Sequence, residues 1–140
     1  MSARPPVIDS GRCSGCLACV KSCPNEALSA SWRPEALDLW YDPGRCLFCG
    51  RCAEVCPEKA IEYAAQGLAP QSRVEKTLLA QLAAFNCAAC GAWFTAVSGQ
   101  ERIEEKLNRP DRNFFGPRQT LCPRCRQEEA ARARHGWRER

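Results

Sequence analysis

Short apolar runs separated by turn residues occupy the first half of the chain and predict four strands. These runs are rich in β-branched, aromatic or other apolar residues, and they lie at residues 7–9, 28–31, 37–41 and 61–63. Helical turns are predicted between them, at residues 17–22 and 50–55. Elements this short cannot bury a large apolar core by themselves, so something else must help to hold this region together.

The pattern changes after residue 64. Residues 64–73 are rich in Ala, Gln, Gly, Pro and Ser, which is typical of a linker. The following segment, residues 74–85, has apolar residues at helical spacing and predicts a helix. These apolar residues are Val74, Leu78, Leu82 and Phe85.

Two further helices are predicted towards the end of the chain. Ser98 and Glu101 have the spacing of a capping box, which predicts a helix through about residue 107 that ends before Pro110. The polar segment at residues 127–134 predicts a short exposed helix.

The first half is also an internal duplication. The Gly-Arg-Cys sequence at 11–13 recurs at 44–46, and the same offset superposes the Cys-Pro pair at 23–24 on the pair at 56–57. Each repeat therefore predicts a strand, a cysteine loop, a turn or two of helix and a returning strand.

Cysteine is the residue that changes this picture most. The 140 residues include 12 cysteines, which form six C-x2-C steps, a spacing typical of metal ligands rather than of disulfides. Residues 1–10 contain no apolar stretch of the kind found in signal peptides, so we expect the thiols to meet a reducing cytoplasm. No run of about 18 apolar residues is present, which argues against a membrane span.

The first eight cysteines form the motif C-x2-C-x2-C-x3-C-P twice. Three closely spaced thiolates can hold three corners of an iron-sulfur cube, and in two-cluster ferredoxins the fourth ligand comes from the opposite repeat. The motif therefore predicts two 4Fe-4S clusters, whereas a zinc site would need four ligands without this third cysteine step. The expected ligands are Cys13, Cys16, Cys19 and Cys56 for the first cluster, and Cys46, Cys49, Cys52 and Cys23 for the second.

Two clusters in one small domain indicate electron transfer rather than catalysis. No open metal position or acid-base pair accompanies the cysteines in the sequence, and the only histidine, His135, lies in the polar tail. We therefore expect no intrinsic catalytic site.

The last four cysteines form two C-x2-C pairs, which together supply four thiolates for one tetrahedral metal ion. These cysteines are Cys87, Cys90, Cys122 and Cys125. Their flanking residues resemble the knuckles of zinc ribbons and rubredoxins. Zinc is the expected metal, and a single iron is the alternative that the same ligands allow.

Together these patterns predict an α+β protein with four regions. A two-cluster ferredoxin-like domain is expected at residues 1–66, a linker and helix at 67–86, a zinc-ribbon-like or rubredoxin-like metal domain at 87–126, and a basic tail at 127–140.

The charge distribution bears on possible partners. The net charge is +4, and the entire excess lies in residues 118–140, which hold 7 arginines and 3 glutamates. A basic tail can bind nucleic acid, an anionic membrane surface or an acidic protein. The glutamates interrupt this tail and no series of aromatic residues accompanies it, so nucleic-acid binding by a zinc-ribbon protein is the remote alternative.

Beyond the motif itself, the chain resembles a particular family. The segment GRCLFCGRCAEVCP at residues 44–57, the Trp-containing strand at 37–41 and the second C-x2-C region resemble the small iron-sulfur subunit of formate hydrogenlyase and other group 4 membrane-bound NiFe hydrogenases. That subunit is related to the two-cluster hydrophilic subunit of respiratory complex I. The resemblance extends from about residue 11 to residue 125.

The resemblance implies a subunit that relays electrons through two 4Fe-4S clusters within a membrane-associated hydrogenase complex. Expected partners are the hydrogenase small and large subunits, a ferredoxin-like or dehydrogenase module that donates or accepts electrons, and indirectly the membrane arm. The expected location is cytoplasmic, on the inner face of the inner membrane. A relay subunit of another complex I-related ferredoxin- or quinone-linked oxidoreductase is the alternative.

The charge of residues 1–66, with 7 basic and 8 acidic groups, favours a fixed subunit over a diffusing carrier. Free bacterial-type ferredoxins, by comparison, are usually strongly acidic.

Overall fold

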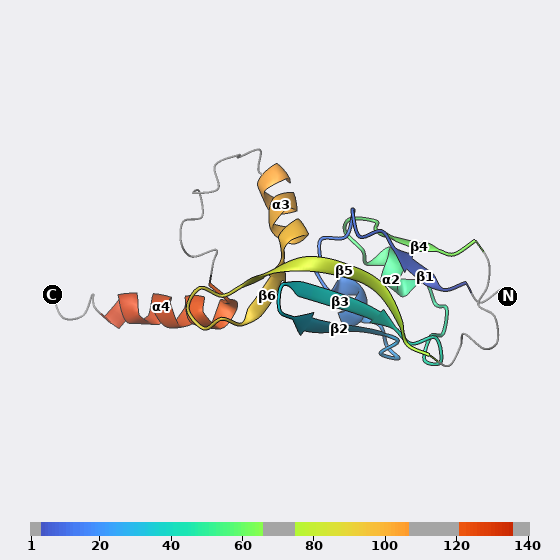
Figure 1. The fold of residues 1–140 in the computed structure, drawn as a ribbon, viewed down its shortest axis with the longest axis horizontal. Coiled ribbons are helices and arrows are strands. Elements are labelled where there is room, and N and C mark those ends of the chain that lie inside the picture. Colours follow the sequence, from blue (N-terminus) through green and yellow to red (C-terminus); the bar gives the residue numbers. More distant parts are fainter. Residues whose placement is uncertain (1–3, 66–74, 107–120, 136–140) are drawn as a thin grey trace.

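The computed structural model describes residues 4–65, 75–106 and 121–135, and these residues form a mixture of helices and sheets (Figure 1). The elements in chain order are β1 Pro6–Ile8, α1 Ala18–Ser22, β2 Leu28–Arg33, β3 Ala36–Tyr41, α2 Arg51–Glu54, β4 Ile61–Tyr63, β5 Thr77–Asn86, β6 Trp93–Ala96, α3 Val97–Lys106 and α4 Pro123–His135. Figure 1 shows the β1–β4 pair with α2 towards one end of the molecule and α4 at the other, with a curved sheet between them.

The elements predicted for the first half are confirmed, with ends that differ only slightly from the expected ones. The largest difference is in β2, which runs on to Arg33 because it forms a hairpin with β3. The turn of that hairpin places Glu35 in the left-handed region, at a φ of 64°.

The two repeats pair with each other rather than each with itself. Strand β1 of the first repeat pairs antiparallel with β4 of the second, and β2 pairs antiparallel with β3. The pair Ile8–Ile61 corresponds, at the offset of the duplication, to the pair Tyr41–Leu28. Each returning strand therefore completes its hydrogen bonds on the other repeat, which ties the two halves into one unit.

The duplication is visible in the backbone as well. Within the two repeats, the positions with a φ in the left-handed region occur as three pairs of equivalent positions. These pairs are Gly15 and Phe48, Leu17 and Gly50, and Glu26 and Lys59. Only two of these six positions are glycines, so the loop geometry is imposed on side chains that rarely adopt it.

The segment predicted as a helix at residues 74–85 is instead mainly a strand, and this prediction is wrong. Strand β5 pairs antiparallel with β3 and then with β6, which gives a four-stranded sheet in the order β2-β3-β5-β6. Leu82 lies opposite Leu37 and is 4% exposed, whereas Leu78 is 43% exposed. Pairing with β3 satisfies a strand edge that a helix at this place would leave open, and this tertiary contact overrides the local preference.

Strand β5 also bears on the predicted boundary near residue 66. The segment assigned to the linker and helix, 67–86, contributes β5 to the same sheet as β2 and β3, which belong to the region predicted as the ferredoxin-like domain. Residues 66–74 lie outside the described residues.

The two later helices are present, but the capping box is not. Helix α3 begins at Val97, directly after β6, so Ser98 lies inside the first turn rather than before it. The Ser98 hydroxyl is buried and has no hydrogen-bond partner among the described residues. Helix α4 begins at Pro123, earlier than the predicted start at residue 127.

One apolar core joins the two repeats and the added strands. Buried side chains from β1 to β6 meet there, together with Cys19 of α1. The buried members are Ile8, Cys19, Ala27, Leu28, Leu37, Leu39, Tyr41, Ile61, Ala80, Leu82 and Ala96. Six of the predicted cluster cysteines pack against or within this core, so the same residues that stabilise the fold also surround the candidate cofactor sites.

None of the helices in the described part of the chain combines the length and the apolar character needed to cross a membrane.

The strand assignment of β5 can be tested with a matched pair of substitutions. Leu82→Ala should lower the free energy of unfolding by about 2–5 kcal/mol, because it removes buried methyl groups from the core. Leu78→Ala should change it by less than about 1 kcal/mol, because Leu78 is largely exposed. Anaerobic denaturant unfolding of the cluster-loaded protein measures both, and equal losses would support a helix with both residues on its buried face.

Candidate metal centres

The cysteines predicted to hold the second cluster line a single cavity. The empty space among them is about 470 Å³, a volume that includes the solvent at its open mouth. Cys46, Cys49 and Cys52 come from the second repeat, and Cys23 comes from the first. The structure therefore places Cys23 beside three cysteines of the opposite repeat.

Two tyrosines that sequence reasoning missed also line this cavity. The buried Tyr41 hydroxyl has no hydrogen-bond partner among the described residues. Burial raises the pKa of Tyr41, and the neighbouring Cys46 raises it further. Burial, followed by the charge of Cys52, raises the pKa of Tyr63 to about 12. Both hydroxyls thus stay protonated and can donate hydrogen bonds to sulfur.

This donor chemistry fits an iron-sulfur cluster. A buried hydroxyl without a partner is costly, and a sulfur-rich group in the cavity would supply the missing acceptor for Tyr41. The counterpart of Tyr41 in the first repeat is Ile8, which has no donor. A tyrosine in a strand next to a cysteine motif is the only sequence signal for this role, and it does not distinguish a residue that contacts a cofactor from a core residue.

The cysteines predicted for the first cluster also come together across the repeats. Burial raises the pKa of Cys13, a backbone N–H of Gly15 lowers it, and the nearby Cys16 and Cys56 raise it. Cys56 belongs to the second repeat, so a cysteine of each repeat lies near cysteines of the other. Cys19, the most buried of these eight cysteines, completes the set.

The two sets of cysteines are neighbours. Burial raises the pKa of Cys19 to about 12, and the charges of Cys13, Cys16 and also Cys52 of the other set contribute to this shift. Helix α1, which contains Cys19, contacts α2, which contains Cys52. Two cofactors held by these sets would therefore be adjacent within one core.

Backbone N–H groups point at the sulfur atoms in a pattern that repeats. Ala27 N donates to Cys23 Sγ and Ala60 N donates to Cys56 Sγ, each at 3.3 Å. These bonds follow the Cys-Pro pairs at 23–24 and 56–57. Hydrogen bonds to sulfur stabilise the charged form of a thiolate and are one means of setting the potential of a cluster.

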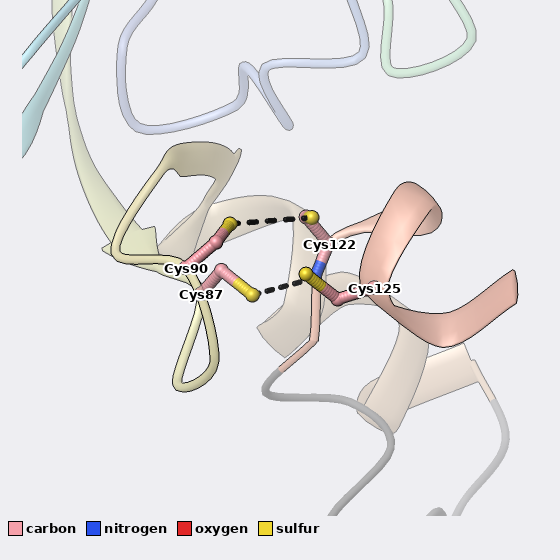
Figure 2. A group of neighbouring side chains, drawn as sticks. All are labelled: Cys87, Cys90, Cys122 and Cys125. Carbon is pink, nitrogen blue, oxygen red and sulfur yellow. Dashed lines mark hydrogen bonds between the residues drawn. The ribbon is translucent and has the colours of Figure 1, made fainter. Parts of the chain in front are cut away.

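The last four cysteines converge on one point (Figure 2). Their four Sγ atoms lie within 4.8 Å of one another, and Cys90 Sγ is 3.8 Å from Cys122 Sγ. A tetrahedral ion with bonds of about 2.3 Å to sulfur requires Sγ atoms about 3.8 Å apart. The spacing therefore fits a single ion.

The turn between β5 and β6 forms half of this centre. Gly91 N donates to Cys87 O and Cys87 N donates to Ala92 O, both at 2.8 Å. Gly91 has a φ of 73°, which suits glycine because it has no Cβ. Figure 2 shows Cys122 and Cys125 approaching from the start of α4.

The electrostatics of this centre favour metal binding. Backbone N–H groups, chiefly that of Cys122 at 3.2 Å from the sulfur, lower the pKa of Cys87 to about 6. Hydrogen bonds to the neighbouring Cys122, Cys90 and Cys87 raise the pKa of Cys125 to about 12, since the thiol is then the donor. Cys87 is thus available as a thiolate near neutral pH, and a cation would be needed to hold four thiolates together.

The four-cysteine centre is connected to the first-repeat loop by a short, continuous piece of chain. Strand β6 leaves the turn at the four-cysteine centre and leads into α3. The last residue of β6, Ala96, packs so closely on Gly15 that a Cβ added to Gly15 would lie 2.5 Å from the Ala96 Cβ. A Cβ added to Gly99 would lie 2.5 Å from the carbonyl oxygen of Ser14. Arg102 also donates to the carbonyl oxygen of Gly11 at 3.3 Å. Helix α3 therefore covers the loop that contains Cys13 and its neighbours.

Comparison with known protein families bears on the two cysteine motifs of the first half of the chain. Residues 12–60 match the family described as the 4Fe-4S dicluster domain. None of the curated proteins compared matches the chain. The match supports an iron-sulfur protein of ferredoxin type, 4Fe-4S cluster binding and an electron-transfer role.

Removing the Tyr41 hydroxyl should lower one reduction potential. In Tyr41→Phe, the cluster held by Cys46, Cys49, Cys52 and Cys23 should shift by roughly 40 mV to more negative potential, because a hydrogen bond of about 1 kcal/mol favours the more negative, reduced cluster. The other cluster serves as an internal control. Redox titration followed by EPR measures both, and equal shifts, or none, would contradict this role for Tyr41.

Breaking the four-cysteine centre should disturb the two clusters unequally. In the double variant Cys87→Ser with Cys122→Ser, we expect the cluster near Gly15 to lose oxygen stability, because α3 is no longer fixed over its loop. The other cluster should keep its EPR signal. The rate at which each EPR signal is lost during exposure to air measures this effect. Equal loss of both signals would contradict the prediction.

Proposed function

We propose that this protein is an electron-relay subunit that carries electrons through two adjacent 4Fe-4S clusters. The observation that carries the proposal is the cavity that gathers Cys46, Cys49 and Cys52 with Cys23 of the other repeat, within a segment that matches the 4Fe-4S dicluster domain. In the proposed assignment, Cys13, Cys16, Cys19 and Cys56 hold the first cluster. When bound, the clusters supply the one-electron chemistry, while the chain excludes water, orients the sulfur ligands and tunes their charge.

In the proposed role the four-cysteine centre is structural and binds zinc. Four thiolates at tetrahedral spacing leave no open coordination position, and three of the four cysteines are buried. Zinc does not change redox state, so the centre would hold the β5–β6 turn against α4 without taking part in electron flow. A single iron is the alternative, and it would add a third redox centre.

The setting we propose is a membrane-associated hydrogenase complex similar to formate hydrogenlyase, on the cytoplasmic face of the inner membrane. The support is the resemblance of residues 44–57 and of the second cysteine region to the iron-sulfur subunit of those complexes. The near balance of charge in residues 1–66 also favours a fixed subunit. The proposed partners are the hydrogenase small and large subunits and a ferredoxin-like or dehydrogenase module, with the membrane arm as an indirect partner.

In this setting α4 is proposed as a docking surface for an acidic partner. Exposed arginines occur along it, among them Arg124, Arg126, Arg132 and Arg134, and only Arg124 pairs with a glutamate of the helix, Glu128, at 3.1 Å. Exposed charges of one sign contribute more to the rate and register of association than to its affinity.

Hydrogen itself provides the test of this setting. The tagged chain, purified anaerobically from its own cells, should contain nickel from a bound hydrogenase, and its 4Fe-4S EPR signals should develop under hydrogen. Dithionite reduction of the same sample is the control, because it reduces the clusters whatever the partner. Clusters that respond to dithionite but not to hydrogen, in a nickel-free preparation, would exclude the hydrogenase and favour another complex I-related oxidoreductase.

A further inference from the structure

We propose that the second cluster exchanges electrons with a partner protein across an exposed lip formed by Leu47 and Phe48. The partner this surface fits is a one-electron carrier whose cofactor lies at an apolar surface bordered by carboxylates. This inference rests on the proposed relay function and adds to it the cluster, the surface and the kind of partner.

The comparison of the two repeats is the starting point. At the offset of the duplication, Leu47 and Phe48 correspond to Ser14 and Gly15. Both pairs lie between the first two cysteines of their motif, and Gly15 and Phe48 share a left-handed backbone, with φ of 68° and 54°. The two loops therefore have the same backbone form but opposite side chains, small in one repeat and large and apolar in the other.

The small residues of the first repeat have a clear structural cause. Strand β6 and helix α3 of the same chain cover that loop, and a Cβ on Gly15 would collide with Ala96. The first-repeat loop is therefore an interface within the molecule. The equivalent loop of the second repeat has room for large side chains, and among the described residues it presents them to solvent.

Exposing the apolar side chains of Leu47 and Phe48 to water costs free energy, and a structural role does not explain this exposure. Leu47 is 65% exposed and Phe48 is 39% exposed. Phe48 also holds a positive φ, which is rare for a bulky residue, and its N–H donates to Cys46 Sγ at 3.4 Å. Strained backbone and exposed apolar side chains tend to occur together at binding surfaces.

The position of the lip indicates what binds there. Leu47 and Phe48 belong to the wall of the cavity that gathers the second set of cysteines, so a protein docked on them would approach that cofactor closely. Tyr63, also in this wall, is 41% exposed and extends the apolar surface. A redox protein is the partner for which this proximity has a use.

The charge next to Leu47 and Phe48 indicates which charges should border the docking surface of the partner. Apart from the cysteines and tyrosines, Arg51 is the only ionisable residue that the described part of the chain contributes to the cavity wall. It is exposed and forms no ion pair with any residue in the described ranges. A carboxylate on the partner would pair with it, and such rim charges mainly raise the rate of association. Each encounter would move one electron, oxidising the carrier and reducing the cluster, with no bond broken.

Electron transfer from a reduced flavodoxin provides the test, because flavodoxins are small acidic one-electron carriers with an exposed flavin edge. The double variant Leu47→Ser with Phe48→Ser should lower the second-order rate constant by about tenfold in anaerobic stopped-flow measurements. Arg51→Glu should lower the rate at low salt, and added salt should lower the rate of this variant less than that of the wild type, because a local attraction has become a repulsion. The matched control is Ile103→Ser, an exposed apolar residue of α3 that is 53% exposed, and it should leave the rate unchanged.

Reduction by the methyl viologen radical separates the possible failures. If the viologen reduces no cluster in the wild-type chain, the relay function itself fails. A different outcome is that the viologen reduces every variant equally while flavodoxin either reduces none of them or reduces the Leu47/Phe48 variant at the wild-type rate. In both cases the lip is not the docking surface and the relay function stands. A loss of rate in Ile103→Ser alone would place the exchange at the first repeat instead.

Discussion

The pairing of each repeat with the other is the interaction on which the rest of the structure depends. Strands β1 and β4, and strands β2 and β3, join residues of different repeats, and reciprocal hydrogen bonds from Asp9 N to Ala60 O at 2.9 Å and from Asp42 N to Ala27 O at 2.8 Å extend that exchange. Because the strands cross over, the fourth cysteine of each motif is delivered to the opposite half of the core. Neither repeat has a complete pair of strands alone, and in the proposed assignment each cluster takes its fourth thiolate from the opposite repeat.

Strands β5 and β6, helix α3 and the four-cysteine centre form a second unit that is added to this duplicated core and makes its two ends different. Strand β5 adds to the edge of β3, and the chain then turns at the four-cysteine centre and returns through β6 and α3 to the first-repeat loop. The small residues of that loop accommodate the added unit. The second-repeat loop has no such cover among the described residues, and its large apolar residues remain at the surface. The two equivalent loops of the duplicated core therefore have different surroundings, one covered by the same chain and one exposed.

The sequence predicted the elements whose position is set by local chemistry. Cysteine spacing and turn residues located the strands and helical turns of both repeats, because cysteine loops leave the chain few alternatives. The strand at β5 was missed because its buried positions on either side of Leu82 are the small Ala80 and Ala84, so the apolar residues stood out at helical spacing while the alternation was hidden. Its conformation is decided by the open edge of β3, which is a tertiary property. The role of Tyr41 was missed for a similar reason, since only the fold shows that its hydroxyl lacks a partner among the described residues.

The central claim, that the two repeats exchange their fourth cysteine, is tested most directly by assigning each cysteine to an EPR signal. Single Cys→Ser variants should fall into two groups. Cys23→Ser should alter the same cluster signal as Cys49→Ser, and Cys56→Ser should alter the same signal as Cys16→Ser, because in the proposed assignment each pair holds one cluster. If Cys23→Ser instead alters the signal that responds to Cys16→Ser, each motif holds its own cluster and the account of the exchange is wrong.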